Sequence, residues 1–180
     1  DCPFLVLVPS PRPEGATDRE VFDESVGMLL EISDRFKDFR VRFAFEFLGF
    51  GWCSVSTLEQ DSAIVKAVNR SNIGMVLDTF HFYAGGSSIG AIRDVDREKI
   101  FILHVNDAEN RPRAELQDAH RLLPGEGVIP LAEIAARLRQ IRYAGPVSLE
   151  MFRPDYWLRP PEEVAGQGMA AVRRFLALAG

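Results

Sequence analysis

Residues 73–81 read IGMVLDTFH, and this stretch decides the expected fold of the 180-residue chain. Its first five residues are apolar or glycine, a pattern typical of a strand that is buried on both faces, as in a parallel sheet. The run then ends on a carboxylate, Asp78, and His81 follows three residues later. A charged group that ends a buried strand is costly unless it is paired or binds a metal. The stretch therefore predicts a parallel strand with a functional residue, Asp78, at its carboxyl end.

Four further apolar runs predict buried strands at Phe4–Val8, Val41–Phe47, Ile100–Asn106 and Pro146–Glu150. T-D-R-E at 17–20 and the pair Thr57 and Gln60 form capping boxes, which predict helix starts. Periodic apolar residues then predict helices over 17–36, 57–68, 131–141 and 161–178. Strands that alternate with helices form right-handed βα units around a parallel sheet, so we expect an α/β protein.

Two architectures fit this alternation of strands and helices. A doubly wound sheet would need a glycine-rich phosphate loop after its first strand, and PSPRPEG at 9–15 is not such a loop. A β/α barrel instead predicts polar, reactive residues at the carboxyl ends of several strands. The Gly/Ser-rich connection 83–97 is expected to be a mobile loop with a short helix near its end, and the long polar connection 108–127 is expected to cover a site.

The residues at the strand ends match the barrel. The apolar runs close on Glu46 in FAFEF, on Asp78, on His104 in ILHVND and on Glu150 in VSLEMF. A single carboxylate there is most often a helix cap or an ion-pair partner, and a single histidine in an apolar run is most often a core residue. Four such residues at one end of a sheet instead favour a shared cation, which would relieve their repulsion. Three carboxylates and an imidazole suit one divalent ion: Mn²⁺, Mg²⁺, Co²⁺ or Zn²⁺.

The composition limits the partners of the protein. The chain has 26 acidic and 21 basic residues, and its net charge of −5 disfavours binding to nucleic acid or to an anionic membrane. No apolar run reaches the ~20 residues of a membrane helix. Cys2 and Cys53 lie outside any CxxC spacing. We therefore expect a soluble, cytoplasmic protein with a small polar partner, no nucleic acid and no membrane.

Five segments carry a family resemblance: FAFEFLGF at 43–50, GMVLDTFHFYAGGSSI at 74–89, IFILHVNDAEN at 100–110, LLPGEGVIPL at 122–131 and VSLEMFRPDYW at 147–157. Together they resemble the xylose-isomerase-like sugar isomerase and epimerase superfamily, nearest its branch of 2-keto-myo-inositol (inosose) isomerases. The resemblance implies an eight-stranded TIM barrel. It also implies that residues 1–180 are a single partial barrel domain, the C-terminal part with about strands 4–8, and that strands 1–3 lie upstream of Asp1.

The resemblance also implies a mechanism. The metal ligands of the family fall on Glu46, Asp78, His104 and Glu150. The implied reaction moves a proton next to the carbonyl of a keto-sugar or inosose through an enediolate, which the metal stabilises. Glu46 and Glu150 are then the expected base and acid, and His81 is expected to contact a substrate oxygen.

The roles of four other residues are less sharply defined. Arg121 and Arg153 are the expected clamps on the substrate, and an ordinary surface arginine is the alternative for each. Asp118 and His120 form a D-x-H pair in the long connection. This pair would either hold a second metal or brace the loop, and we expect bracing because the visible carboxylates are already committed to the first ion.

Two other functions stay open at this point. An endonuclease IV-type DNA-repair enzyme uses the same barrel. Four motifs echo that family: D-T-x-H at 78–81, H-x-N-D at 104–107, the D-x-H of Asp118 and His120, and G-E-G at 125–127. The acidic balance and the lack of a basic cluster count against it. The chain is alternatively a non-catalytic sugar-binding fragment. Five parallel strands leave two open edges, which a second copy would cover in a homo-oligomer.

Overall fold

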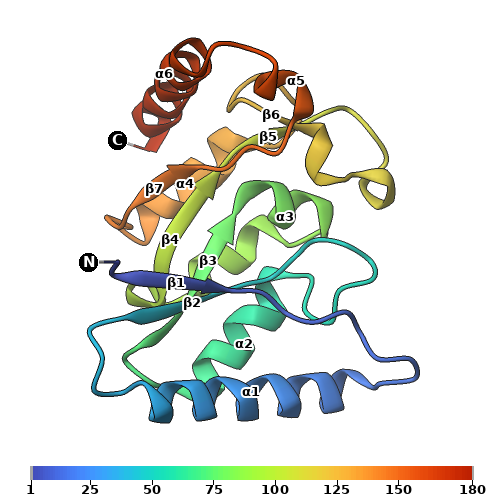
Figure 1. Cartoon of the computed structure of the whole chain (residues 1–180), viewed down its shortest axis with the longest axis vertical. Helices are drawn as coiled ribbons and strands as arrows, with labels where there is room; N and C mark the ends of the chain where they lie inside the picture. Colours follow the sequence, from blue (N-terminus) through green and yellow to red (C-terminus); the bar gives the residue numbers. More distant parts are fainter. Residues whose placement is uncertain (1, 180) are drawn as a thin grey trace.

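Five parallel strands build the central sheet, in the order β1-β2-β3-β4-β7 (Figure 1). The computed structural model describes residues 2–179. The strands of this sheet are β1 (Phe4–Leu7), β2 (Arg42–Glu46), β3 (Ile73–Asp78), β4 (Ile100–Val105) and β7 (Val147–Leu149). Each lies where the apolar runs predicted it, and every neighbouring pair is parallel. The α/β prediction is therefore confirmed.

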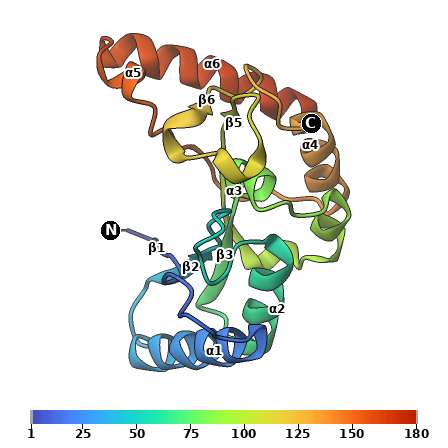
Figure 2. The same cartoon turned by 90° about the vertical axis from the view of Figure 1, so that its right-hand side faces the viewer.

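Four longer helices pack against one face of the sheet: α1 (Asp18–Arg35), α2 (Leu58–Val68), α4 (Leu131–Gln140) and α6 (Pro161–Ala179). Both predicted capping boxes are present, because the side chains of Thr17 and Thr57 accept hydrogen bonds from the N–H groups of Glu20 and Gln60. In Figure 2 the helices form an arc around the strands that is open on one side. Among residues 2–179, no helix is both long and apolar enough to cross a membrane.

The two faces of the sheet differ. One face points into a large apolar cluster to which all four longer helices contribute, and strand residues such as Phe45 and Leu77 belong to it. The other face carries a small cluster without helical residues: Ala44, Val76 and Phe101. Side chains alternate along a strand, so Glu46 and Asp78 share this second face with Ala44 and Val76. Helices on one face only are typical of a barrel wall, whereas a doubly wound sheet has helices on both faces.

The connections contain more regular structure than the sequence predicted. Helix α3 (Thr79–Ala84) follows β3 directly, and β5 (Asp107–Ala108) pairs antiparallel with β6 (Arg121–Leu122). The remaining short helices are η1 (Ile89–Asp94), η2 (Arg97–Lys99), η3 (Arg113–Glu115), η4 (Asp118–His120) and α5 (Pro154–Trp157). Elements of two to six residues are too short to show a hydrophobic period. The connection 83–97, predicted as a mobile loop, contains η1 and the start of η2.

Asp107 ties the long connection 108–127 to the sheet. Its Oδ1 accepts hydrogen bonds from the backbone N–H groups of Ala108 (2.9 Å) and Ile129 (2.8 Å), and its Oδ2 accepts one from Gly125 (3.0 Å). Gly127 passes so close that a Cβ there would collide with the Ala108 carbonyl. The buried carboxylate thus fixes the turn that contains G-E-G.

We expect Asp107→Ala to lower the free energy of unfolding by about 2–4 kcal/mol, because it leaves three backbone N–H groups without their acceptor. Urea unfolding followed by circular dichroism measures the loss. Asp96→Ala is the matched control, since the side chain of Asp96 accepts one hydrogen bond, from the Glu98 N–H in an exposed segment. Similar losses in the two variants would show that Asp107 is not a special brace.

Candidate metal centre

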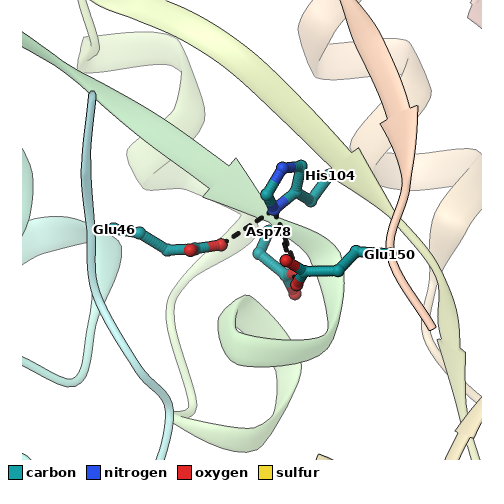
Figure 3. A group of neighbouring side chains, drawn as sticks. All are labelled: Glu46, Asp78, His104 and Glu150. Carbon is teal, nitrogen blue, oxygen red and sulfur yellow. Dashed lines mark hydrogen bonds and ion pairs between the residues drawn. The ribbon is translucent and has the colours of Figure 1, made fainter. Parts of the chain in front are cut away.

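The four predicted ligands meet at the carboxyl end of the sheet (Figure 3). His104 Nδ1 lies 3.0 Å from Glu46 Oε1, 3.5 Å from Glu150 Oε2 and 3.9 Å from Asp78 Oδ2. One ligand atom from each residue lies within 4.8 Å of the others. Glu46 and Glu150 reach the group from opposite sides in Figure 3. We call these four residues the ligand cluster.

The backbone places each member of the ligand cluster. Glu46 and Asp78 are the last residues of β2 and β3, and Glu150 follows β7. Asp78 and His104 are register partners across β3 and β4. Asp78 also caps α3, because its Oδ1 accepts a hydrogen bond from the His81 N–H at 2.9 Å. Its second oxygen, Oδ2, faces His104 in the cluster.

Burial and mutual repulsion set the protonation of the cluster. Burial raises the pKa of Glu46 to about 7, against the hydrogen bond from His104. Burial lowers the pKa of His104, but its hydrogen bonds to Glu150 and Glu46 outweigh burial and raise that pKa to about 10. Burial alone would raise the pKa of Asp78. The positive charge of the Arg121 guanidinium outweighs burial, so the pKa of Asp78 lies below its ordinary value. In the protein alone, a proton on His104 therefore offsets part of the negative charge.

The donor set fits a divalent cation. Three carboxylate oxygens and one imidazole nitrogen suit Mn²⁺, Mg²⁺, Co²⁺ or Zn²⁺. The side chains of Glu46, Asp78 and His104 are buried, while that of Glu150 keeps 27% of its surface exposed. Buried carboxylates this close together repel one another unless a positive charge compensates them. The structure thus brings together all four predicted ligands, and metal analysis is the test of their role.

A second layer of polar groups supports the cluster. Arg121 Nη1 donates to Asp78 Oδ2 at 2.7 Å and lies 3.2 Å from Glu150 Oε2. Arg121 Nη2 lies 3.0 Å from His81 Nε2. A guanidinium can only donate, so Nε2 accepts and the proton of His81 sits on Nδ1. Burial lowers the pKa of His81, which agrees with a neutral ring.

Two residues of this layer were not predicted. Asn106 Nδ2 donates to Asp78 Oδ2 at 3.0 Å, and the Thr79 hydroxyl donates to Asn106 Oδ1 at 2.8 Å. Both side chains are fully buried. Their signal in the sequence is their place in the D-T-x-H and H-x-N-D motifs, since Thr79 follows one ligand directly and Asn106 lies two residues after His104.

The remaining predicted residues lie outside the ligand cluster. Arg153 Nη1 pairs with Glu109 Oε1 at 2.6 Å. Asp118 Oδ1 lies 2.9 Å from Arg121 Nη2, and His120 Nδ1 accepts a hydrogen bond from the backbone N–H three residues before it. These contacts agree with a bracing role for the D-x-H pair. The clamp roles of Arg121 and Arg153 stay predictions.

The comparison with known families decides the affiliation of the chain. The family described as Xylose isomerase-like TIM barrel matches residues 1–175. The chain belongs to this family. The predicted TIM-barrel fold is thereby confirmed, and the resemblance that five sequence segments indicated is confirmed with it.

This chain is also similar to individual known proteins. It is 41% identical to inosose isomerase of Bacillus subtilis over 160 residues, which are 89% of this chain and 58% of the relative. It is similar to the crystal structure of IOLI protein with a binding zinc atom, with a TM-score of 0.95, 37% identity and coverage of 98% of this chain and 64% of that chain. D-psicose 3-epimerase with D-tagatose from Clostridium cellulolyticum H10 shares the fold, at a TM-score of 0.70, 23% identity and coverage of 94% and 61%. The chain thus spans about 58% of the length of the curated relative.

Removing one donor should abolish tight metal binding. We expect His104→Ala and Asp78→Asn each to weaken Zn²⁺ binding at least ~100-fold. Each substitution removes one of four buried ligands, and a water molecule in its place would bind the ion less strongly. Calorimetric titration and elemental analysis after dialysis measure affinity and stoichiometry, with one ion per chain expected in the wild type. Glu98→Gln is the control, since that carboxylate is 77% exposed on the surface. Unchanged zinc affinity in both ligand variants would refute the site.

Proposed function

We propose that this chain belongs to a metal-dependent isomerase or epimerase that moves a proton next to the carbonyl of a keto-sugar or inosose. The observation that carries the proposal is the convergence of three carboxylates and one imidazole at the carboxyl end of a parallel sheet. Similarity to inosose isomerase and to a zinc-containing structure supports it. The proposal includes a small-molecule substrate, no nucleic-acid partner and a cytoplasmic location.

The chemistry follows from the positions of the two glutamates. A divalent ion held by Glu46, Asp78, His104 and Glu150 would supply Lewis acidity that stabilises the negative charge of an enediolate. Glu46 comes from β2 and Glu150 follows β7, on opposite sides of the cluster (Figure 3). One would take the proton from a substrate carbon, and the other would deliver a proton to the neighbouring carbon.

His81 completes the proposed site. Arg121 binds its Nε2, and the ring of Phe50 meets it edge-on at a centroid distance of 5.1 Å. Its Nδ1 is buried and has no hydrogen-bond partner among the described residues. A substrate oxygen would satisfy this donor, because buried polar groups in proteins are almost always hydrogen-bonded. Arg153, on the adjacent rim, is proposed as a further substrate contact.

We also propose that the chain is a single partial domain, the C-terminal part of a barrel with about strands 4–8. The edge strand β1 leaves Leu5 50% and Val6 41% exposed. A largely apolar cavity of about 330 Å³ lies between β1 and α1, with Val8, Met28 and Leu29 in its lining. An apolar groove beside an open strand edge fits a further βα unit. A second copy of the chain would cover the same groove in a homo-oligomer.

Exchange of a substrate proton with solvent tests the reaction directly. We expect the metal-loaded protein to place deuterium on the carbon next to the carbonyl of an inosose in D₂O, as followed by NMR. Glu150→Gln should slow this exchange at least ~100-fold, because general acid–base groups contribute about that much or more. Glu98→Gln is the control, because that carboxylate is 77% exposed and has no proposed role in the site. A metal-loaded protein that binds inosose but never exchanges its proton would overturn the proposal.

The same preparations test the endonuclease alternative. We expect no nicking of an abasic duplex at physiological salt and one metal ion per chain. His120→Ala should leave that stoichiometry at one, because the structure uses His120 Nδ1 in a hydrogen bond within its own loop. Two or three ions per chain, reduced by this substitution and accompanied by nicking, would favour the endonuclease.

A further inference from the structure

Arg121 is a fully buried guanidinium beside the ligand cluster, with an exposed fraction of 0%. Its Nη1 faces Asp78 Oδ2 at 2.7 Å and Glu150 Oε2 at 3.2 Å. Its Nη2 and Nε lie 2.9 Å and 3.0 Å from Asp118 Oδ1. Every nitrogen of the side chain therefore has an acidic partner within the protein, and none faces solvent. A buried cation without such partners would be very costly.

The orientation of the guanidinium is set by its surroundings. Its Cζ lies 4.7 Å from the ring centroid of Phe80 and 5.3 Å from that of Phe152, so two aromatic rings contact the cation. Its backbone is the first residue of β6, which pairs with β5. The two rings and the β5–β6 pair thus hold the side chain in its position.

Arg121 binds the same oxygens that the ligand cluster offers. Asp78 Oδ2 and Glu150 Oε2 approach both the guanidinium and His104 Nδ1. A carboxylate oxygen has two lone pairs, so Glu150 Oε2 can accept from the guanidinium and also bind a cation. Asp78 Oδ2 already accepts from Arg121 and Asn106, so a cation there would replace one of these two donors. The three carboxylates exceed the charge of a divalent ion by one. Arg121 supplies a positive charge against this excess, and it shares that charge with Asp118, whose side chain is 42% exposed.

We propose that Arg121 is a built-in countercation of the metal centre. Before loading, it holds the carboxylates of Asp78 and Glu150 together against their repulsion, and after loading it balances the remaining charge. The inference rests on the proposed metal site. It makes Arg121 a positioning residue that acts through the ligands, whereas the clamp role expected from the sequence requires contact with substrate.

Thermal unfolding of Arg121→Met with and without Zn²⁺ tests the proposal. The metal-free variant should lose on the order of 10 °C in Tm, because removing one partner of a buried ion pair leaves the others uncompensated. The zinc-loaded variant should lose less than half as much, because the bound ion then supplies positive charge to the same oxygens. The rise in Tm on adding zinc is therefore larger in the variant than in the wild type.

Two further variants sharpen the test. Arg121→Lys keeps the charge without the planar fork, so its rise in Tm on zinc addition should stay near that of the wild type. It also keeps the proposal testable if Arg121→Met does not fold. Arg153→Met removes a guanidinium whose partner, Glu109, lies outside the cluster. In this control, the rise in Tm on adding zinc should equal that of the wild type.

Three results would overturn the countercation. An equal loss of Tm with and without zinc in Arg121→Met would indicate core packing alone. A zinc-induced rise in Tm as large in Arg121→Lys as in Arg121→Met would show that charge is not the cause. A raised KM of Arg121→Met with both of its Tm values unchanged would identify a substrate clamp. Zinc titration of the wild type separates these results from failure of the metal site, since a wild type without bound zinc defeats the site itself.

Discussion

The buried carboxylate of Asp78 is the group on which the rest of the site depends. It ends β3 with an exposed fraction of 0%. Its Oδ1 accepts from the His81 N–H, and its Oδ2 accepts from Asn106 and Arg121. An ion without solvent is tolerated only where its lone pairs are satisfied and its charge is compensated. This requirement joins β3, α3, the end of β4 and β6 at one point.

Compensation of this charge explains why the long connection after β4 folds onto the sheet. Arg121 lies at the far end of that connection, and its guanidinium must reach Asp78 while its own donors stay paired. Asp107 fixes the returning turn through three backbone N–H groups. The connection is therefore part of the site, and its folding and the arrangement of the ligands depend on each other.

The fold alone leaves the substrate undetermined. Inosose isomerase is a relative of this chain, and D-psicose 3-epimerase with D-tagatose shares its fold. In barrels of this kind, reactive groups sit at the carboxyl ends of strands and on the loops that follow, so the loops change the substrate while the ligands stay at the strand ends. Phe50, His81 and Phe152 all follow the ligands in this way, and Phe50 and Phe152 contact His81 and Arg121 respectively.

The sequence alone was enough to predict the five strands, the longer helices and the four residues of the ligand cluster. Each of these is a local pattern: an apolar run, a capping box, or a charged residue at a strand end. The partners of these residues came only from the tertiary structure. Arg121 and Asp78 are 43 positions apart, and no local pattern shows that the guanidinium is buried against the carboxylate and not turned to solvent. Helix α3 and the β5–β6 pair are too short for a period, so their position follows from hydrogen bonds to buried groups, and those exist only once the chain has folded.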